Sequence, residues 1–217
     1  MKRKSTSQKD TNKKQKKGNV CTYILHKMII LKNVLSDSEQ INLYKKCVNF
    51  NKKYYQNLEE LNPKDVNGYI KWLGEIINLN DETNCDIQKI HKDLTSIFQN
   101  VMEMVNIKYP NKKWIKDIET GFINKTNGIM CLSYPNTGYL DAHYDKWSDW
   151  NMLISIGGSS EFEYPRGNIR LDSGDIIIFN GNHKHHKVKL VDKCTNPLWE
   201  KNSYGFHRCC IQLRKLI

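Results

Sequence analysis

The second half of the chain contains side chains with the types and spacing of a metal site. His143 and Asp145 lie two residues apart, so both would project from one face of an extended strand. His186 follows later, inside the run His183-Lys184-His185-His186. Two histidines and one carboxylate form the facial triad that binds non-haem Fe(II) and leaves coordination positions open. The spacing therefore points to iron, although two surface polar residues would produce the same His-x-Asp pattern by chance.

A second candidate feature is a pair of arginines near the C-terminus. Arg208 and Arg214 are two of only five arginines, and an even spacing in an apolar strand puts them on the same face. The planar guanidinium binds a carboxylate with two hydrogen bonds, where Lys acts as a point charge. A dicarboxylate cosubstrate would explain both residues. The alternative is a pair of solvent-facing cations on an edge strand.

The elements that must position these side chains are short strands. From about residue 113, β-rich runs are separated by turn residues such as Pro135 to Gly138 and Asp172 to Gly174. The expected strands are Gly128–Tyr134, Tyr139–His143, Asn151–Gly157, Glu161–Tyr164, Ile169–Leu171, Asp175–Asn180, His186–Val191 and Phe206–Leu213. Eight short strands in about 100 residues predict a jelly roll or barrel rather than βαβ units.

The first half of the chain is predicted to be mainly helical. Thr22–Leu31 has the composition of a strand, and Ser36 with Glu39 forms a capping box for a helix that extends to about Phe50. Residues 51–83 are polar and mixed, as in a lid or a substrate-facing insertion. Cys85–Val105 has the periodicity of an amphipathic helix. We expect a mainly β fold with flanking helices (α+β), in which a helical or lid part, about residues 19–112, packs on a jelly-roll core of about residues 113–217.

Composition indicates one intracellular domain preceded by a basic tail. The 217 residues suffice for one core, no apolar run approaches 18 residues, and none of the seven cysteines forms a Cys-x-x-Cys pair, which favours reduced thiols. Residues 2–17 hold eight basic residues and one acidic residue, a net charge of +7 out of +11. We expect residues 1–18 to be disordered. The tail could direct nuclear import, bind phosphates or simply keep the protein soluble.

In their order along the chain, these signals resemble the AlkB-like group of Fe(II)- and 2-oxoglutarate-dependent dioxygenases. The family pattern is a Tyr, a Gly, His-x-Asp, an apolar strand, Gly-Asp before another apolar strand, the distal His, and a strand with paired arginines. The matching residues are Tyr134, Gly138, His143, Asp145, Met152–Gly157, Gly174, Asp175, His186, Arg208 and Arg214. The resemblance covers roughly residues 128–217, and it favours His186 over His183 and His185 because the ligand stands two residues before an apolar residue.

The resemblance implies a mechanism. His143, Asp145 and His186 would hold Fe(II), and 2-oxoglutarate and O2 would occupy the open positions. Arg208, with help from Tyr134, would bind the distal carboxylate of 2-oxoglutarate, and Arg214 would lie nearer the 1-carboxylate. Oxidative decarboxylation would yield succinate and CO2, and a hydroxylated N-methyl group would leave as formaldehyde.

The resemblance also implies a substrate class, alkylated nucleobases in DNA or RNA, as in DNA repair. A base in a duplex must be flipped into the pocket. Trp147 and Trp150 could stack on a base and Lys146 could contact a phosphate, although the tryptophans could equally be core or lid aromatics. We expect a monomer that binds nucleic acid and no membrane.

Three positions depart from the family pattern, and two other functions remain open. Leu132 and Cys210 replace asparagines, and Gln212 replaces a threonine, which affects the hydrogen bonds expected around the cosubstrate. One rival function is a prolyl- or lysyl-type protein hydroxylase, in which Lys189 or Lys193 would bind the distal carboxylate. The other is a jelly-roll nucleic-acid-binding module without catalysis.

Overall fold

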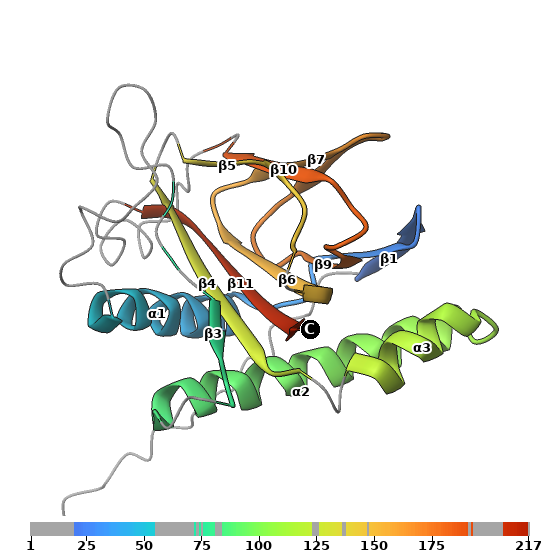
Figure 1. Cartoon of the computed structure of the whole chain (residues 1–217), viewed down its shortest axis with the longest axis horizontal. Helices are drawn as coiled ribbons and strands as arrows, with labels where there is room; N and C mark the ends of the chain where they lie inside the picture. Colours follow the sequence, from blue (N-terminus) through green and yellow to red (C-terminus); the bar gives the residue numbers. More distant parts are fainter. Residues whose placement is uncertain are drawn as a thin grey trace, which may run out of the picture.

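Two β-sheets face each other, and helices cover the outer side of the larger sheet (Figure 1). The computed structural model describes residues 20–54, 72, 74, 76–80, 84–122, 126–135, 138–146, 148–190, 192 and 206–216. The helices are α1 (Asp37–Tyr54), α2 (Cys85–Lys108) and α3 (Lys113–Phe122). The strands are β1 (Cys21–Leu25), β2 (Met28–Lys32), β3 (Ile76–Asn78), β4 (Gly128–Pro135), β5 (Tyr139–His143), β6 (Ser148–Gly157), β7 (Ser160–Tyr164), β8 (Gly167–Leu171), β9 (Ile176–Asn180), β10 (His186–Leu190) and β11 (Phe206–Leu216).

The major sheet has the strand order β1-β2-β9-β6-β11-β4-β3, and the minor sheet has the order β5-β10-β7-β8. Neighbouring strands pair antiparallel throughout both sheets. Two antiparallel sheets packed face to face confirm the jelly-roll prediction, and the flanking helices confirm the α+β class. Strands β1, β2 and β3 come from the N-terminal part, so both parts of the chain contribute to the major sheet.

Strand alternation divides the interior into two cores. On the helix side, Ile129, Ile154 and Ile211 pack with residues of all three helices. Between the sheets, Leu132, Leu153 and Cys210 pack with side chains of the minor sheet. The two faces of each central strand therefore serve different cores, because successive side chains point to opposite sides.

Most predicted elements are present, and the differences have local causes. The capping box is formed, since the Ser36 amide donates to Glu39 Oε2 at 2.7 Å. The expected strand Thr22–Leu31 is instead the hairpin of β1 and β2, turned at His26 and Lys27, which have φ values of 48° and 59°. The pair His26-Lys27 is not one of the Gly-containing pairs that mark a two-residue hairpin turn, so the sequence carries no turn signal there.

Helix α3 lies inside the region expected to be purely β. It buries Ile115, Ile118 and Phe122, which have helical spacing but cover little more than two turns. Strand β3 adds an edge to the major sheet from within the polar segment 51–83. The rest of that segment, apart from Trp72, Gly74 and residues 79–80, lies outside the described residues or belongs to α1, and so does the expected tail at residues 1–18. None of the described helices is long and apolar enough to cross a membrane.

Candidate metal and cosubstrate site

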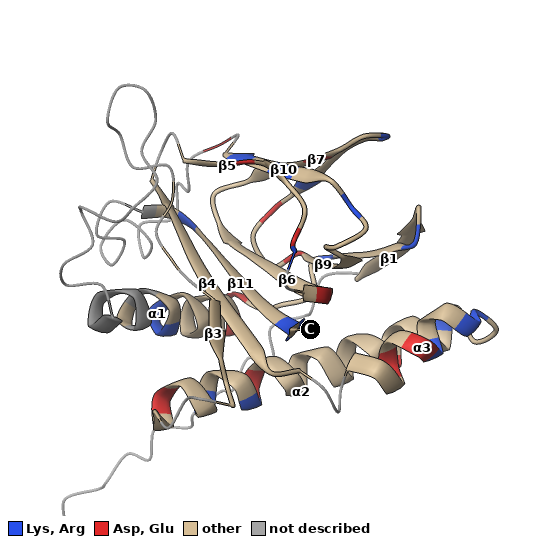
Figure 2. Ribbon diagram, in the orientation of Figure 1, with Lys and Arg blue, Asp and Glu red and all other residues tan. Residues whose placement is uncertain are grey.

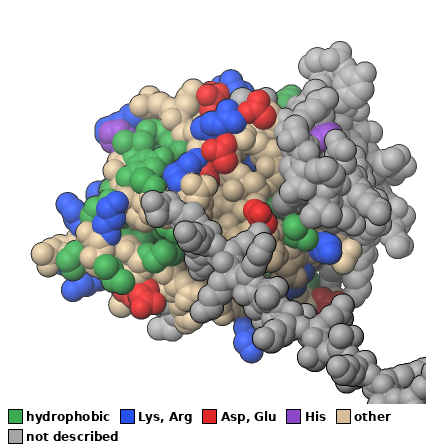
Figure 3. Space-filling model, turned by 180° about the vertical axis from the view of Figure 1, so that it is seen from behind, with side chains coloured by type: hydrophobic (Ala, Val, Ile, Leu, Met, Phe, Trp, Pro, Cys, Tyr) green, Lys and Arg blue, Asp and Glu red, His purple; other side chains and the backbone are tan. Residues whose placement is uncertain are grey.

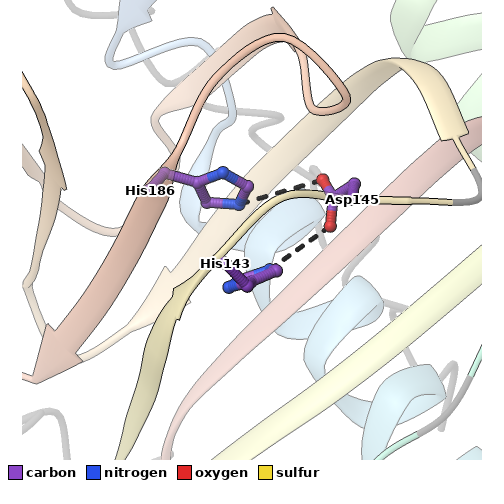
Figure 4. Close-up of side chains that lie close together, drawn as sticks. All are labelled: His143, Asp145 and His186. Atoms are coloured by element: carbon purple, nitrogen blue, oxygen red, sulfur yellow. Dashed lines mark ion pairs between the residues drawn. The ribbon is translucent and has the colours of Figure 1, made fainter.

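Strand pairing in the minor sheet brings the three predicted metal ligands together (Figure 4). His143 is the last residue of β5 and His186 is the first residue of β10, and the two are directly paired across these antiparallel strands. Asp145 follows β5 and turns back toward both rings. Among the residues that the structure describes, this is the one group of three potential metal-ligating side chains whose ligand atoms lie within 4.8 Å of one another.

The nitrogen atoms that face the carboxylate are available as ligands. His143 Nε2 lies 3.3 Å from Asp145 Oδ1, and His186 Nε2 lies 3.8 Å from Asp145 Oδ2. The Nδ1 atoms lie 2.7 Å from the carbonyl oxygens of Asp141 and Lys184, respectively. A carbonyl only accepts, so each Nδ1 carries its proton and each Nε2 keeps its lone pair. Backbone acceptors of this kind orient metal-binding histidines.

The surroundings favour the metal-binding protonation states of two of the ligands. Burial opposes ionisation of Asp145, but hydrogen bonding with His143 and the charge of Arg214 outweigh it and lower the pKa of Asp145 to about 2. Burial lowers the pKa of His186 to about 4, although Asp145 acts in the opposite direction. The pKa of His143 is raised, because hydrogen bonds with Asp145 and the Asp141 carbonyl outweigh burial. At neutral pH the site therefore presents a carboxylate and a neutral His186.

Two residues that the sequence did not single out hold Asp145 in place. Asn151 of β6 is fully buried, and its amide donates to Asp145 Oδ2 at 2.6 Å. Gly181 accepts from the Asp145 backbone amide at 3.0 Å, and a Cβ atom at Gly181 would lie 2.1 Å from Asp145 Oδ2. The available signals were weak: a polar residue within the apolar run around Met152, and an Asn-Gly pair after β9.

Arg208 has the features expected of a carboxylate-binding residue. It is 1% exposed, and none of its three guanidinium nitrogens has a hydrogen-bond partner among the described residues. Its guanidinium carbon lies 4.9 Å from the centre of the Tyr134 ring. Burial raises the pKa of Tyr134, so its hydroxyl is protonated and can donate. A buried, unpaired cation beside a hydroxyl donor fits the distal carboxylate of a dicarboxylate, because that ligand would supply the missing charge and acceptors.

Arg214, in contrast, is fully engaged. Its Nε donates to Gln212 Oε1 at 2.7 Å, and its terminal nitrogens donate to Ser148 Oγ and Asp145 Oδ1, both at 3.3 Å. Arg214 is thus placed beside a metal ligand, at the metal end of the row of β11 side chains. The predicted sharing of one face by Arg208 and Arg214 is confirmed, and Cys210 and Gln212 lie between them, joined by a 3.4 Å contact from Nε2 to Sγ.

The predicted substrate contacts are placed differently. Lys146 is exposed just after Asp145, and Trp147 lies outside the described residues. Trp150 is on the helix side of β6, stacked on Trp114 with ring centres 6.4 Å apart, so the structure does not bring it to the metal cluster. Leu132 is buried in the core between the sheets.

The alternative histidines and Lys189 lie outside the cluster. His183 and His185 line a surface basin beside it. Lys189 points outward and pairs with Glu161, away from the metal ligands. Lys193 is outside the described residues.

Comparisons with known proteins show similarity in sequence and in fold. No protein-family model matches the chain. The Arabidopsis thaliana protein named DNA N(6)-methyladenine demethylase ALKBH1C is 25% identical over 213 residues, which are 85% of this chain and 47% of that protein. The chain therefore spans about half the length of this curated relative.

The same fold is present in a solved structure. The structure of OsALKBH1 superposes with a TM-score of 0.61 at 18% identity, over 90% of this chain and 100% of that one. A prolyl-4-hydroxylase from Pseudomonas putida gives a TM-score of 0.48 at 11% identity, over 87% and 91% of the two chains, too low to bear on function. In its jelly-roll fold, and in the His-x-Asp and distal His that cluster in it, the chain is similar to AlkB-like proteins.

Proposed function

We propose that the protein uses Fe(II), 2-oxoglutarate and O2 to demethylate alkylated nucleobases in DNA or RNA. The observation that carries the proposal is the combination, in one core, of the ligand group His143, Asp145 and His186 with the unpartnered guanidinium of Arg208. A metal group alone would suit many functions, and a buried arginine alone would be an unexplained cost to stability. Together they fit a metal-chelating dicarboxylate.

Each residue would have a distinct part in the reaction. His143 and His186 would bind the metal through Nε2 and Asp145 through its carboxylate, while Asn151 and Arg214 keep that carboxylate oriented. When bound, the iron and its cosubstrate supply the oxidation of a substrate C–H bond. Arg208 would hold the distal carboxylate of 2-oxoglutarate, with Tyr134 as a neighbouring donor.

Aromatic side chains keep water away from His186. The ring of Phe162 stacks on the His186 ring with centres 5.1 Å apart, and Phe179 meets it edge-on at 5.0 Å. His186 itself is 4% exposed. An apolar wall around one ligand favours a neutral imidazole and limits solvent access to the reacting atoms.

The substrate class has separate support. The Arabidopsis relative is named for N6-methyladenine in DNA, so this base is the first lesion to test. A nucleobase would reach the site unpaired, either from a single strand or by flipping. The basic residues at 2–17, which lie outside the described residues, would add salt-sensitive affinity for phosphates.

The test is succinate formation from 2-oxoglutarate and Fe(II), with and without oligonucleotides that carry N6-methyladenine or another N-methylated base. Asp145→Ala, which removes a metal ligand, is the blank. Lys113→Gln on the exposed start of α3 is a matched control that should keep full activity. We expect turnover that depends on the methylated oligonucleotide, with one formaldehyde released for each methyl group removed.

Two other outcomes would contradict the proposal in different ways. Turnover that is indifferent to oligonucleotides but stimulated by proline- or lysine-containing peptides would indicate a protein hydroxylase. No turnover above the Asp145→Ala blank, with oligonucleotide binding intact, would indicate a binding module without catalysis.

A further inference from the structure

A basin of about 410 Å³ opens on the surface beside the metal ligands. Four segments form it: the turn between β1 and β2, the loop that follows β5, the turn between β7 and β8, and the loop that leads into β10. Its lining residues are His26, Lys27, Tyr144, Tyr164, Pro165, Arg166, His183, Lys184 and His185. No acidic side chain of the described residues is among them.

Some residues of the basin are neighbours of the metal ligands in the chain. Tyr144 stands between His143 and Asp145 in the chain and is 50% exposed. The backbone carbonyl of Lys184 accepts from Nδ1 of His186 at 2.7 Å. Lys184, which orients His186, and Tyr144, which stands between the other two ligands in the chain, therefore both line the basin. A molecule held there would lie close to the segments that carry the metal ligands.

Three cations converge on the basin from three of its segments. Lys27, Arg166 and Lys184 all line it. Arg166 Nη1 also lies 3.3 Å from His26 Nδ1. Basic positions mark the ribbon ends of β1 and β7 in Figure 2. Cations that line one depression produce a positive potential there, which attracts an anion.

The nearby outer face of the minor sheet differs, because its cations are paired. Lys187 pairs with Glu163, and Lys189 pairs with Glu161 and Glu163. In Figure 3, basic and acidic side chains are interspersed along the top of the molecule, on the side of the minor sheet. The absence of acidic partners is thus a property of the basin rather than of the whole surface that the structure describes.

The turn that delivers His26 and Lys27 is unfavourable for these residues. Both adopt left-handed backbone conformations, with φ values of 48° and 59°. The left-handed region is unfavourable for most residues other than Gly, Asn or Asp. Asn-Gly would form the same two-residue turn without that cost. Retaining an imidazole and an ammonium there is consistent with a binding role for the turn.

Aromatic rings complete the basin. The Tyr144 ring contacts His185 with centres 4.9 Å apart, and Tyr164 contacts His26 at 6.1 Å. Cations that track a phosphate backbone, interleaved with flat rings on which bases stack, are the combination used to bind single-stranded nucleic acid. An acidic peptide would use the cations but would leave the rings without a matching partner.

We propose that this basin binds the sugar-phosphate backbone of the nucleic-acid strand next to the modified base, with Lys27, Arg166 and Lys184 contacting phosphates and Tyr144 stacking on a neighbouring base. The inference rests on the proposed function and adds to it the path of the strand. It places the phosphates on the β1–β2 and β7–β8 turns, which are remote from the metal ligands in the sequence.

The test is binding of a fluorescein-labelled single-stranded 12-nucleotide DNA to the metal-free full chain, followed by anisotropy at several salt concentrations. The variant is Lys27→Asn with Arg166→Gln, since Asn tolerates the positive φ at residue 27. The matched control, Lys113→Asn with Lys116→Gln, removes the same charge from exposed positions of α3. Thermal unfolding by circular dichroism verifies that both variants fold.

We expect the basin variant to bind at least about tenfold more weakly and the slope of log affinity against log salt to fall by about 1.4, or about 0.7 for each lost phosphate contact. The control should keep the wild-type slope. Equal losses in both variants would overturn the proposal, because they would indicate a general charge effect. The proposal would also be overturned if a 12-residue glutamate peptide bound the wild type as tightly as the DNA and lost as much affinity in the basin variant.

This test is independent of catalysis. Because it uses metal-free protein, it can detect DNA binding by the basin even when no demethylation is found. Conversely, oligonucleotide-dependent turnover with unchanged DNA binding in the basin variant would support the reaction and reject this path for the strand.

Discussion

At the scale of single residues, the ligand set is prepared for a cation before one binds. Asp145, with a pKa of about 2, and His186, with a pKa of about 4, are ionised and neutral, respectively, from above about pH 4 to neutral pH. His143 is the exception, because its raised pKa means that a proton competes with the metal there. Metal affinity should therefore fall on acidification, first through His143.

The lowered pKa of His186 predicts a pH dependence of stability in the metal-free protein. Between about pH 6.5, where an unfolded histidine titrates, and about 4, the unfolded state binds a proton that the folded state does not. The free energy of unfolding should therefore fall by up to about 3 kcal/mol as the pH drops through this window.

Urea unfolding at several pH values measures this effect, with His186→Asn as the comparison because Asn does not titrate. The raised pKa of His143 acts above this window and the lowered pKa of Asp145 acts below it. Identical pH profiles for the wild type and His186→Asn would contradict the assignment.

A second prediction concerns Gly181. In Gly181→Ala the new methyl group would collide with Asp145 Oδ2 and with Asn151 Nδ2, at 2.1 and 2.4 Å, so Asp145 must move. We expect metal affinity to fall on the order of 10- to 100-fold, as when the partners of a ligand are removed. Calorimetric titration with Mn²⁺ or Fe²⁺ measures it. Gly121→Ala is the control, since a Cβ atom there meets nothing within 4 Å.

At the scale of elements, β11 separates two kinds of arginine on one face. The guanidinium of Arg208 has no hydrogen-bond partner among the described residues, whereas that of Arg214 donates hydrogen bonds to Asp145, Gln212 and Ser148. Removing an unpaired buried charge stabilises a protein, and removing one member of a buried ion pair destabilises it by about 3–5 kcal/mol. The two arginines should therefore respond to the same substitution in opposite directions.

Accordingly, Arg208→Met should unfold at a higher temperature than the wild type in the absence of 2-oxoglutarate, yet lose 2-oxoglutarate binding while keeping the metal. Arg214→Met should unfold at a lower temperature and bind metal weakly, because Asp145 loses a donor. Differential scanning fluorimetry with and without 2-oxoglutarate compares the two variants. A lower melting temperature for Arg208→Met would show that its guanidinium has a partner in solution.

The sequence predicted the structure best where side chains alternate along a strand with a period of two residues. Alternation in β11 predicted the shared face of Arg208 and Arg214, and the eight expected strands of the second half are all present with small shifts at their ends. It was uninformative where a contact depends on the fold. No local pattern indicates that Gly181 must touch Asp145, or that Trp150 faces Trp114 rather than the metal ligands.

At the scale of the whole molecule, most of the net positive charge lies outside the described residues. Residues 2–17 carry +7, so the other 201 residues carry about +4 of the total of +11. Under the proposed function, the part of the chain that the structure describes would bind nucleic acid through local features such as the basin, while the tail would act through general attraction.

Deleting residues 1–17 tests that division. The affinity for unmodified oligonucleotide should fall, and its salt dependence should flatten, while uncoupled succinate formation stays unchanged because the metal site is intact. Anisotropy and a succinate assay on the same preparation measure both. An unchanged salt slope would show that the tail does not contact phosphates.

The division of the interior into two cores also limits how the sequence of such a chain can evolve. Along β11, odd-numbered residues such as Cys209, Ile211 and Leu213 face the helices, and even-numbered residues from Arg208 to Arg214 face the other sheet. Substitutions at odd positions can alter the packing of the helices with little effect on the site. A single inserted residue in the strand would exchange the two sets, burying arginines among aliphatic side chains and aiming aliphatic side chains at the metal. This strand can therefore diversify by substitution, but it cannot change its length.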